Sequence, residues 1–254
     1  MYSSVTTIFR LIVILCVGAL VGCANIQYRA GDTVVTQVNT IKNQARPSVV
    51  LVHGCGGPGP NQHWMPILDN AGFNAILVDY IHYRGYNSVC DGNIPFSINN
   101  TISDLDEIIG WVKNQDWHTG GISVMGFSLG GGIVNSFTDL DSLKAKGIIV
   151  KEISKLSSII SIYPLCGVGP LASTTKIPTQ LHFGLNDFWT HHSYCMTDRL
   201  DKINYELVYY ENAMHGFDIP GTPTHVNGIY RLQYNPEAYQ QIQKNVIRFL
   251  KIHL

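Results

Sequence analysis

Short, unbroken apolar runs recur along this chain and alternate with helical patterns. Residues 49–52 and 75–78 are the clearest runs, and further ones occupy residues 122–125, 158–163, 179–183 and 205–210. Runs of this kind are typical of parallel strands that helices cover on both faces. The alternation therefore predicts a doubly wound, mainly parallel α/β sheet, with the functional residues at the carboxyl ends of the strands.

Two helices are clear from the spacing of their apolar residues. In the first, residues three and four positions apart form one apolar face: Ile98, Ile102, Leu105, Ile108, Ile109 and Val112. The second begins after Asn235 with Pro236, which the first turn of a helix tolerates, and continues towards the C-terminus. Residues 25–32 are interpreted as a tether or a first short strand.

The composition favours one folded domain. At 254 residues the chain is long enough for a substantial core, and α/β folds of this size commonly form a single unit. Hydrophobic residues make up 45% and charged residues 14%, which argues against a disordered chain. A net charge of −1, with no basic patch, gives no reason to expect nucleic acid as a partner.

The N-terminus resembles an export signal. Residues 11–21 form an apolar run that follows Arg10, and this run is too short to span a bilayer. It ends in residues 20–23 (LVGC), which resemble the bacterial lipobox, so Cys23 is expected to carry a diacylglyceryl group. The alternatives are a plain signal peptide and a short membrane anchor.

This interpretation divides the chain into three parts. Residues 1–22 are a lipoprotein-type signal peptide, residues 23–33 an anchor and tether, and residues 34–254 a single domain. A lipid at Cys23 would tether the exported domain to a membrane surface. Ala24 beside the anchor resembles lipoproteins sorted to the outer membrane, so the expected location is the periplasm-facing membrane or the outer membrane.

A serine between two glycines marks the candidate nucleophile. Residues 126–130 (GFSLG) follow an apolar run and open a segment that can be helical. A serine on a sharp strand-to-helix turn has strained backbone angles, and only glycines two positions before and after it avoid a clash. Ser128 is therefore the expected nucleophile.

Such a serine needs a histidine to accept its proton and an acid to orient that histidine. In this kind of fold the order along the chain is serine, acid, histidine. Asp187 and His215 have that order, and each follows a predicted strand. The weaker candidates are His225 and His253 for the base, and Asp198 and Asp218 for the acid.

Two backbone amides are expected to bind the oxyanion of the reaction. One belongs to Leu129, directly after the nucleophile, and the other to the loop at residues 53–57 (HGCGG), which follows an early strand. Within that loop the Cys55 amide is favoured, because the glycine before it lets the backbone turn inward. The Gly54 amide is the alternative.

Export also changes how the cysteines are interpreted. Apart from Cys16 in the signal and Cys23 in the lipobox, the chain contains Cys55, Cys90, Cys166 and Cys195. In an oxidising compartment an even number favours two disulfides, and the spacing leaves all possible pairings open. Four free, buried thiols are the alternative.

Aromatic and histidine side chains near the predicted strand ends raise two further questions. The aromatic residues either line an apolar pocket or belong to the core: Trp64, Tyr83, Tyr86, Phe127 and Trp189. Of these, Trp64 and Trp189 are the candidates for substrate binding. The spacing of His182, Asp187, His191 and His192 matches no familiar zinc motif, so no metal is expected.

Several motifs, in the right order, resemble the dienelactone hydrolase family of α/β-hydrolases, particularly its exported branch. The resemblance covers nearly all of residues 45–254 and depends on residues 53–57, 79–90, 126–131, 163–166, 187–195 and 213–217. It implies an α/β-hydrolase fold with an eight-stranded sheet. It also implies hydrolysis of a small carboxylic ester or lactone. It also implies that the enzyme needs neither a metal nor an organic cofactor.

The chain departs from the namesake enzymes of this family at the nucleophile, where they have cysteine and this chain has Ser128. A hydroxyl activated by histidine is the commoner solution for ordinary esters, which weakens dienelactone as the substrate. Arg84 lies near the position where the namesakes place an arginine that binds a substrate carboxylate. The alternative for Arg84 is a surface or structural salt bridge.

The resemblance also implies a cysteine pairing, with Cys55 bonded to Cys90 and Cys166 bonded to Cys195. The first bridge would brace the oxyanion loop. The second would brace the segment after Asp187. Both disulfides would then hold catalytic loops in place as well as stabilise the fold.

Together these features predict an exported, membrane-tethered serine hydrolase. It would cleave a carboxylic ester or lactone through an acyl-enzyme, with Ser128, Asp187 and His215 as the catalytic residues. The alternatives are a peptidase or an acyltransferase that uses the same three groups, and a non-catalytic lipoprotein that uses the fold as a binding module.

Overall fold

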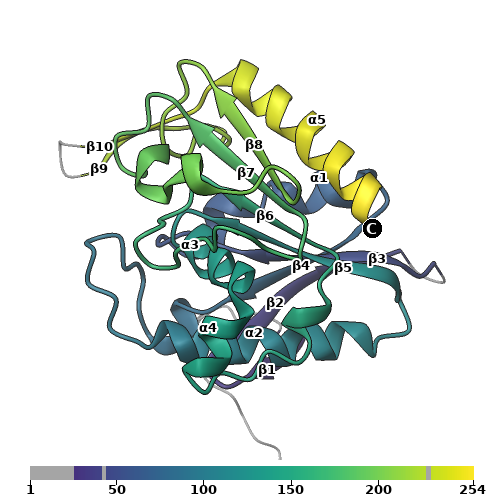
Figure 1. The fold of residues 1–254 in the computed structure, drawn as a ribbon. Helices are drawn as coiled ribbons and strands as arrows, with labels where there is room; N and C mark the ends of the chain where they lie inside the picture. Colours follow the sequence, from purple (N-terminus) through teal and green to yellow (C-terminus); the bar gives the residue numbers. More distant parts are fainter. Residues whose placement is uncertain (1–25, 42–43, 227–229) are drawn as a thin grey trace, which may run out of the picture.

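The structure is a computed structural model that describes residues 26–41, 44–226 and 230–254. Its main feature is a sheet of eight strands in the order β1-β2-β4-β3-β5-β6-β7-β8 (Figure 1). These strands are β1 (Tyr28–Ala30), β2 (Thr33–Asn39), β3 (Arg46–Val52), β4 (Asn74–Asp79), β5 (His118–Phe127), β6 (Ser158–Ile162), β7 (Thr179–Gly184) and β8 (Tyr205–Tyr210). A separate hairpin pairs β9 (Pro223–Val226) with β10 (Tyr230–Gln233).

Neighbouring strands from β4 to β8 are parallel, and β1 and β2 are added antiparallel at one edge. The predicted α/β class with a mainly parallel sheet is confirmed. Residues 28–30 pair with β2, so of the two interpretations of residues 25–32 the first short strand is the correct one for this part. The expected signal peptide and Cys23 lie outside the described residues.

Helices cover both faces of the sheet, as Figure 1 shows. On one face lie α1 (Trp64–Asn70) and α5 (Pro236–His253), and on the other lie α2 (Ile98–Lys113), α3 (Leu129–Asn135) and α4 (Leu140–Ala145). Short 3-10 turns are η1 (Gly59–Asn61), η2 (His82–Arg84), η3 (Ser136–Thr138), η4 (Ile153–Lys155), η5 (His192–Cys195) and η6 (Thr197–Arg199). None of the helices in the described part of the chain is long and apolar enough to cross a membrane.

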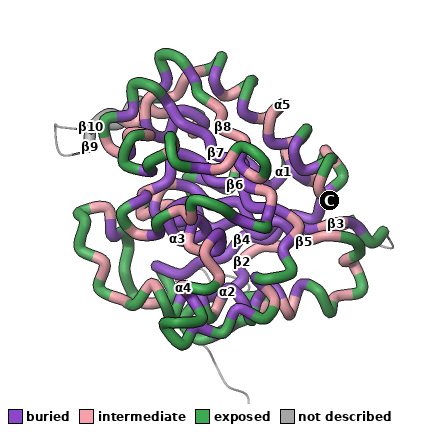
Figure 2. Tube along the Cα trace, in the orientation of Figure 1, coloured by how far each residue is buried: buried purple, intermediate pink, exposed green. Residues whose placement is uncertain are grey.

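The apolar patterns of the two long helices explain this layering. The face of α2 predicted from its spacing is buried against the sheet, and Ser97 caps the helix by accepting a hydrogen bond from the Asn100 amide. In α5 the capping residue is Asn235, followed by Pro236. The sheet itself is the buried centre of the molecule (Figure 2), so the polar residues at the ends of its strands are the ones that can meet a substrate.

Two disulfides connect loops at the carboxyl ends of the parallel strands. Cys55 is bonded to Cys90 and Cys166 to Cys195, which confirms the pairing implied by the resemblance. The first bridge joins the loop after β3 to the loop after β4, and the second joins the segment after β6 to η5. Both bridges therefore connect loops that follow the carboxyl ends of parallel strands.

Candidate active site

The turn between β5 and α3 holds Ser128 in an unusual conformation, with φ 51° and ψ −112°. Both flanking glycines are needed for close packing. A Cβ atom on Gly126 would collide with the Gly130 backbone, and one on Gly130 would collide with the carbonyl oxygens of Val52 and His53. The strained serine and its glycines are therefore fixed by contacts with β3 as well as by the turn itself.

Ser128, His215 and Asp187 form one hydrogen-bonded chain. The Nε2 atom of His215 lies 2.9 Å from the Ser128 hydroxyl, and its Nδ1 atom lies 2.8 Å from Oδ2 of Asp187. An ionised carboxylate can only accept, so Nδ1 carries the hydrogen and Nε2 accepts from the serine. This is the arrangement in which an imidazole can take the serine proton.

The His215 ring is held between two aromatic rings. Its centroid lies 4.6 Å from that of Tyr163 and 4.9 Å from that of Trp189. Its side chain is only 5% exposed. Packing therefore restricts the imidazole to the orientation that the two hydrogen bonds require.

The carboxylate of Asp187 is almost completely buried but well hydrogen-bonded. Its Oδ1 accepts from the backbone amides of Trp189 and Thr190, and its Oδ2 accepts from the Thr190 hydroxyl at 2.8 Å. Burial opposes ionisation, but His215 and these hydrogen bonds outweigh it and lower the pKa of Asp187. Asp187 is therefore ionised at neutral pH, as a partner for His215 must be.

Thr190 is a site residue that the sequence analysis missed. Its hydroxyl also lies 3.0 Å from the Tyr163 carbonyl and 3.2 Å from Nδ1 of His215. An Asp followed by Thr three residues later, just after a strand, could have indicated it, because this spacing lets the aspartate accept from the turn that follows.

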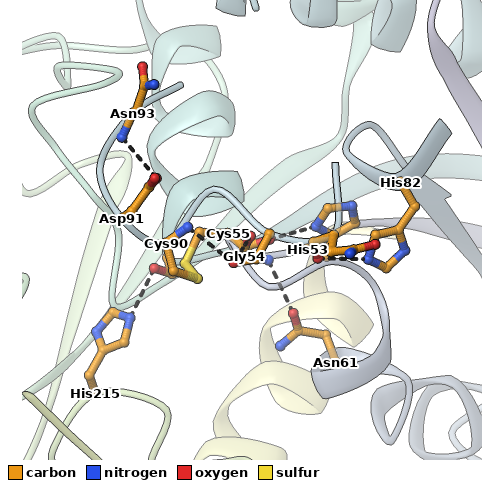
Figure 3. The surroundings of a disulfide bond; sticks show 12 residues. His53, Gly54, Cys55, Asn61, His82, Cys90, Asp91, Asn93 and His215 are labelled. Carbon is orange, nitrogen blue, oxygen red and sulfur yellow. Dashed lines mark hydrogen bonds between the residues drawn. A yellow bond between two sulfur atoms is a disulfide. The ribbon is translucent and has the colours of Figure 1, made fainter. Parts of the chain in front are cut away.

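The loop after β3 lies directly against the serine. A Cβ atom on Gly54 would lie 3.4 Å from the Ser128 Cβ, which shows how closely this loop approaches the nucleophile. The Gly54 amide already donates to Oδ1 of the buried Asn61 at 3.2 Å. Figure 3 shows this loop with the Cys55–Cys90 disulfide and with His215 nearby.

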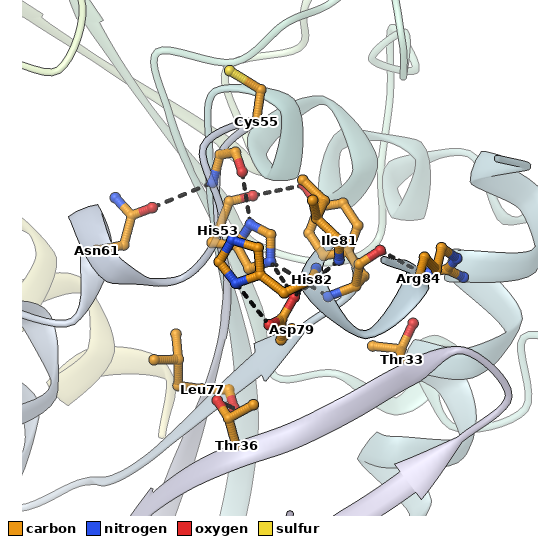
Figure 4. A network of polar contacts seen from close by, with 12 residues as sticks. Thr33, Thr36, His53, Cys55, Asn61, Leu77, Asp79, Ile81, His82 and Arg84 are labelled. Carbon is orange, nitrogen blue, oxygen red and sulfur yellow. Dashed lines mark hydrogen bonds and ion pairs between the residues drawn. The ribbon is translucent and has the colours of Figure 1, made fainter. Parts of the chain in front are cut away.

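A second polar network lies behind this loop (Figure 4). His53 is fully buried and stacks on Tyr80 with a centroid distance of 4.2 Å. Its Nδ1 lies 2.6 Å from the Gly54 carbonyl oxygen, which can only accept, so Nδ1 carries the hydrogen. The Gly54 carbonyl belongs to the same peptide group as the Cys55 amide, so His53 holds that peptide from its far side.

Asp79 completes this network. Its Oδ1 lies 3.5 Å from Nε2 of His53 and accepts from the backbone amides of Ile81 and His82. Burial alone would raise the pKa of Asp79, but the neighbouring His53 and the two amides lower it to about 2. Asp79 and His53 belong to motifs that carry the family resemblance, but no role was predicted for either from the sequence.

The prediction that Trp64 binds substrate is wrong. Its indole is fully buried in the core between the sheet and α1, and its Nε1–H donates to Asp218 at 2.7 Å. Asp218 also accepts from the Tyr163 hydroxyl at 2.6 Å, so this carboxylate is engaged away from His215 and is not the acid of the hydrogen-bonded chain. Phe127 and Trp189, in contrast, line a cavity at Ser128.

The proposed carboxylate-binding role of Arg84 is also contradicted. Its guanidinium is 7% exposed, pairs with Asp104 at 3.3 Å, donates to the Tyr80 carbonyl and lies over the Phe96 ring. The buried Arg84 side chain and these partners therefore hold the loop after β4 against α2. The alternative of a structural salt bridge is the correct one.

The hydrogen-bonded chain at Ser128 is made by His215 and Asp187, and the other candidates belong to other elements. His253 packs on Phe249 near the end of α5, Asp198 belongs to η6 and His225 belongs to β9. His182 is buried between Tyr210 and Gln180. Within residues 26–41, 44–226 and 230–254, no group of three or more His, Cys, Asp or Glu residues could hold a metal ion.

The strand order and the serine turn after β5 define an α/β-hydrolase. The model of the dienelactone hydrolase family matches residues 35–254, so the chain belongs to this family. Family membership makes the protein a hydrolase of an ester or lactone, and an esterase-type enzyme with a small-molecule substrate. No curated protein matches the chain.

Solved structures with this fold include esterases and a dienelactone hydrolase. Esterase 2 of Thermogutta terrifontis phosphonylated by cyclosarin has a TM-score of 0.64 at 17% identity, over 86% of this chain and 88% of that one. The same esterase with bound propionate has a TM-score of 0.62 at 17% identity and the same coverage. A dienelactone hydrolase from Anabaena variabilis has a TM-score of 0.59 at 17% identity, over 87% and 90% of the two chains.

Proposed function

We propose that the protein is a serine hydrolase that cleaves a carboxylic ester through an acyl-enzyme. The Ser128 oxygen attacks the ester carbonyl carbon while its proton passes to Nε2 of His215, and the same proton then goes to the departing alcohol as the carbon–oxygen bond breaks. Water repeats the sequence and releases the acid. The observation that carries this proposal is the pair of hydrogen bonds, 2.9 and 2.8 Å, that join Ser128, His215 and Asp187.

The amides of Leu129 and Cys55 are proposed to bind the oxyanion. Leu129 begins α3, directly after the nucleophile, and both residues line a cavity that contains Ser128. The Gly54 amide is already bonded to Asn61, which favours Cys55 over Gly54 as the second donor. The bond from His53 to the Gly54 carbonyl supports the same choice, because it holds the peptide group whose N–H belongs to Cys55.

The family match supports an ester or lactone as the substrate, and serine at position 128 supports an ordinary ester. The Thermogutta esterase has been solved with bound propionate and after phosphonylation by cyclosarin. Both states agree with a nucleophilic serine hydrolase as the interpretation of this chain.

Labelling with a fluorophosphonate probe tests the proposal. The wild-type protein should be labelled and should hydrolyse nitrophenyl esters, while Ser128→Ala should lose both activities. Ser154→Ala is a matched control, since the Ser154 hydroxyl donates to the Lys151 carbonyl on the surface. Labelling that persists in Ser128→Ala would refute the assignment. Cleavage of peptides, or transfer to an added alcohol in place of water, would reveal a peptidase or an acyltransferase.

We also propose that the protein is exported and anchored by a lipid at Cys23. The support is the apolar run at residues 11–21 and the lipobox-like residues 20–23. In a bacterial host fed with a labelled fatty acid, the wild-type protein should incorporate label and fractionate with membranes. Cys23→Ala should lose both properties, and a protein that stays labelled in this variant would contradict the anchor.

A further inference from the structure

Two cavities meet at Ser128. The first, of about 90 Å³, is lined by His215, Tyr163, Phe127, Ile219 and Leu232 among others. The second, of about 160 Å³, lies on the side of Leu129 and does not include His215. Ser128, Trp189 and the Cys55–Cys90 disulfide border both cavities, so the nucleophile lies at the junction between two separate spaces.

The second cavity is mostly apolar. Its walls come from the disulfide-bonded loop after β4 and from the segment after β6, through Val89, Ile94, Leu165 and Val168. Among the side chains that the structure describes, neither cavity is lined by Lys, Arg, Asp or Glu. A charged group on the substrate would therefore lose its hydration in either space without gaining a partner.

The position of His215 assigns the two spaces to the two halves of an ester. The proton that His215 takes from Ser128 must be delivered to the alcohol oxygen as the ester bond breaks, so the alcohol must leave on the His215 side. The alcohol then occupies the smaller cavity. The acyl group remains attached to Ser128 and occupies the larger cavity beside Leu129 and Val168.

We propose that the substrate is an uncharged ester of a short acid and an even smaller alcohol. Its acyl group binds between the loop after β4 and the segment after β6. This inference rests on the proposed function and goes beyond it by naming the substrate class. A dry cavity of about 150 Å³ binds benzene, so the 160 Å³ space suits an acyl group of up to about six carbons. An acyl group with a free carboxylate does not suit this cavity. A lactone that also has a free acid would supply such a group.

Two truncations on opposite sides of Ser128 test the assignment. Val168→Ala enlarges the acyl cavity, and Ile219→Ala is its matched control in the alcohol cavity. The measured quantity is kcat/KM for methyl esters of increasing acyl length, and for methyl to butyl esters of one short acid. Ile94→Ala is a second acyl-side variant, in case Val168→Ala does not fold.

The wild-type protein should prefer acyl groups of up to about six carbons and lose at least about tenfold in kcat/KM at ten carbons. Val168→Ala or Ile94→Ala should raise the ratio of long to short acyl esters by about tenfold. Ile219→Ala should leave that ratio within about twofold of wild type and change the preference among alcohols instead.

Three results would overturn the inference. The first is an acyl preference that responds to Ile219→Ala and not to the acyl-side variants. The second is an acyl preference that no variant changes. The third is faster hydrolysis of an acyl group with a free carboxylate than of its neutral counterpart. In each case the protein still hydrolyses esters and is still labelled at Ser128, whereas loss of both would refute the proposed function itself.

Discussion

The hydrogen bond from His53 to the Gly54 carbonyl makes a specific prediction about catalysis. His53→Phe preserves an aromatic ring against Tyr80 but removes the 2.6 Å bond that holds the Gly54–Cys55 peptide. If the Cys55 amide binds the oxyanion, this peptide must keep its orientation while charge develops on the substrate. The variant should therefore lose kcat more than it loses substrate binding.

The size of the effect can be bounded from both sides. One neutral hydrogen bond contributes about 1 kcal/mol, which corresponds to about fivefold in rate. Removing an oxyanion donor altogether costs about a hundredfold or more. Because His53→Phe weakens the placement of the donor without removing it, kcat should fall by about fivefold to about a hundredfold, with KM changed less than about threefold.

The assay is the steady-state hydrolysis of a short nitrophenyl ester, with thermal unfolding measured in parallel. Tyr80→Phe is the matched control, because it removes a 2.7 Å bond from the Tyr80 hydroxyl to the His53 carbonyl and leaves the Gly54–Cys55 peptide bonded. It should destabilise the fold by about 1 kcal/mol and leave kcat nearly unchanged. Equal kcat in wild type and a folded His53→Phe would refute the reasoning.

Four further predictions follow from the structure. Asp187→Asn should lower kcat by about 10⁴-fold without unfolding the protein, because an asparagine disturbs the tautomer of His215; activity within tenfold of wild type would remove Asp187 from the mechanism. The pKa of Asp79 is about 2 in the fold, below the ordinary 3.8 of an aspartate, so its ionisation stabilises the fold by about 2 kcal/mol above pH 4, and this contribution disappears as pH falls towards 2. The free energy of unfolding of Asp79→Asn should therefore show a flatter dependence on pH in that range. Replacing Cys55 and Cys90 together with serine should lower kcat in protein that circular dichroism still reports as folded, and unchanged kinetics would show that the bridge serves stability alone. Arg84→Gln should lower the melting temperature and leave KM unchanged for neutral and carboxylated esters, since Arg84 pairs with Asp104 and not with the cavity; a selective rise in KM for the carboxylated ester would restore its binding role.

The sequence was most informative where a local pattern has one structural solution. Apolar runs predicted the parallel strands, and two glycines around Ser128 predicted the turn, because the close contacts of Gly126 and Gly130 with neighbouring backbone tolerate no side chain. The three residues Ser128, Asp187 and His215 could also be predicted to meet, because each follows a strand and the carboxyl ends of parallel strands lie on the same side of the sheet.

Roles that depend on which way a buried side chain faces could not be read in this way. Trp64 and Arg84 are near catalytic loops in sequence, yet both face into the structure, where Asp218 and Asp104 bind them. The network of His53 and Asp79 forms only when the ends of β3 and β4 meet. The cysteine pairing came from a family resemblance, because spacing alone allowed every alternative.

The proposed mechanism requires Ser128 to carry the acyl group during turnover. The most direct measurement is rapid acid quenching of the enzyme during hydrolysis of a short ester, followed by mass spectrometry of its peptides. The peptide that contains Ser128 should carry an acyl group in the wild-type enzyme and none in Ser128→Ala. Rapid turnover with the acyl group on a different residue would contradict this mechanism.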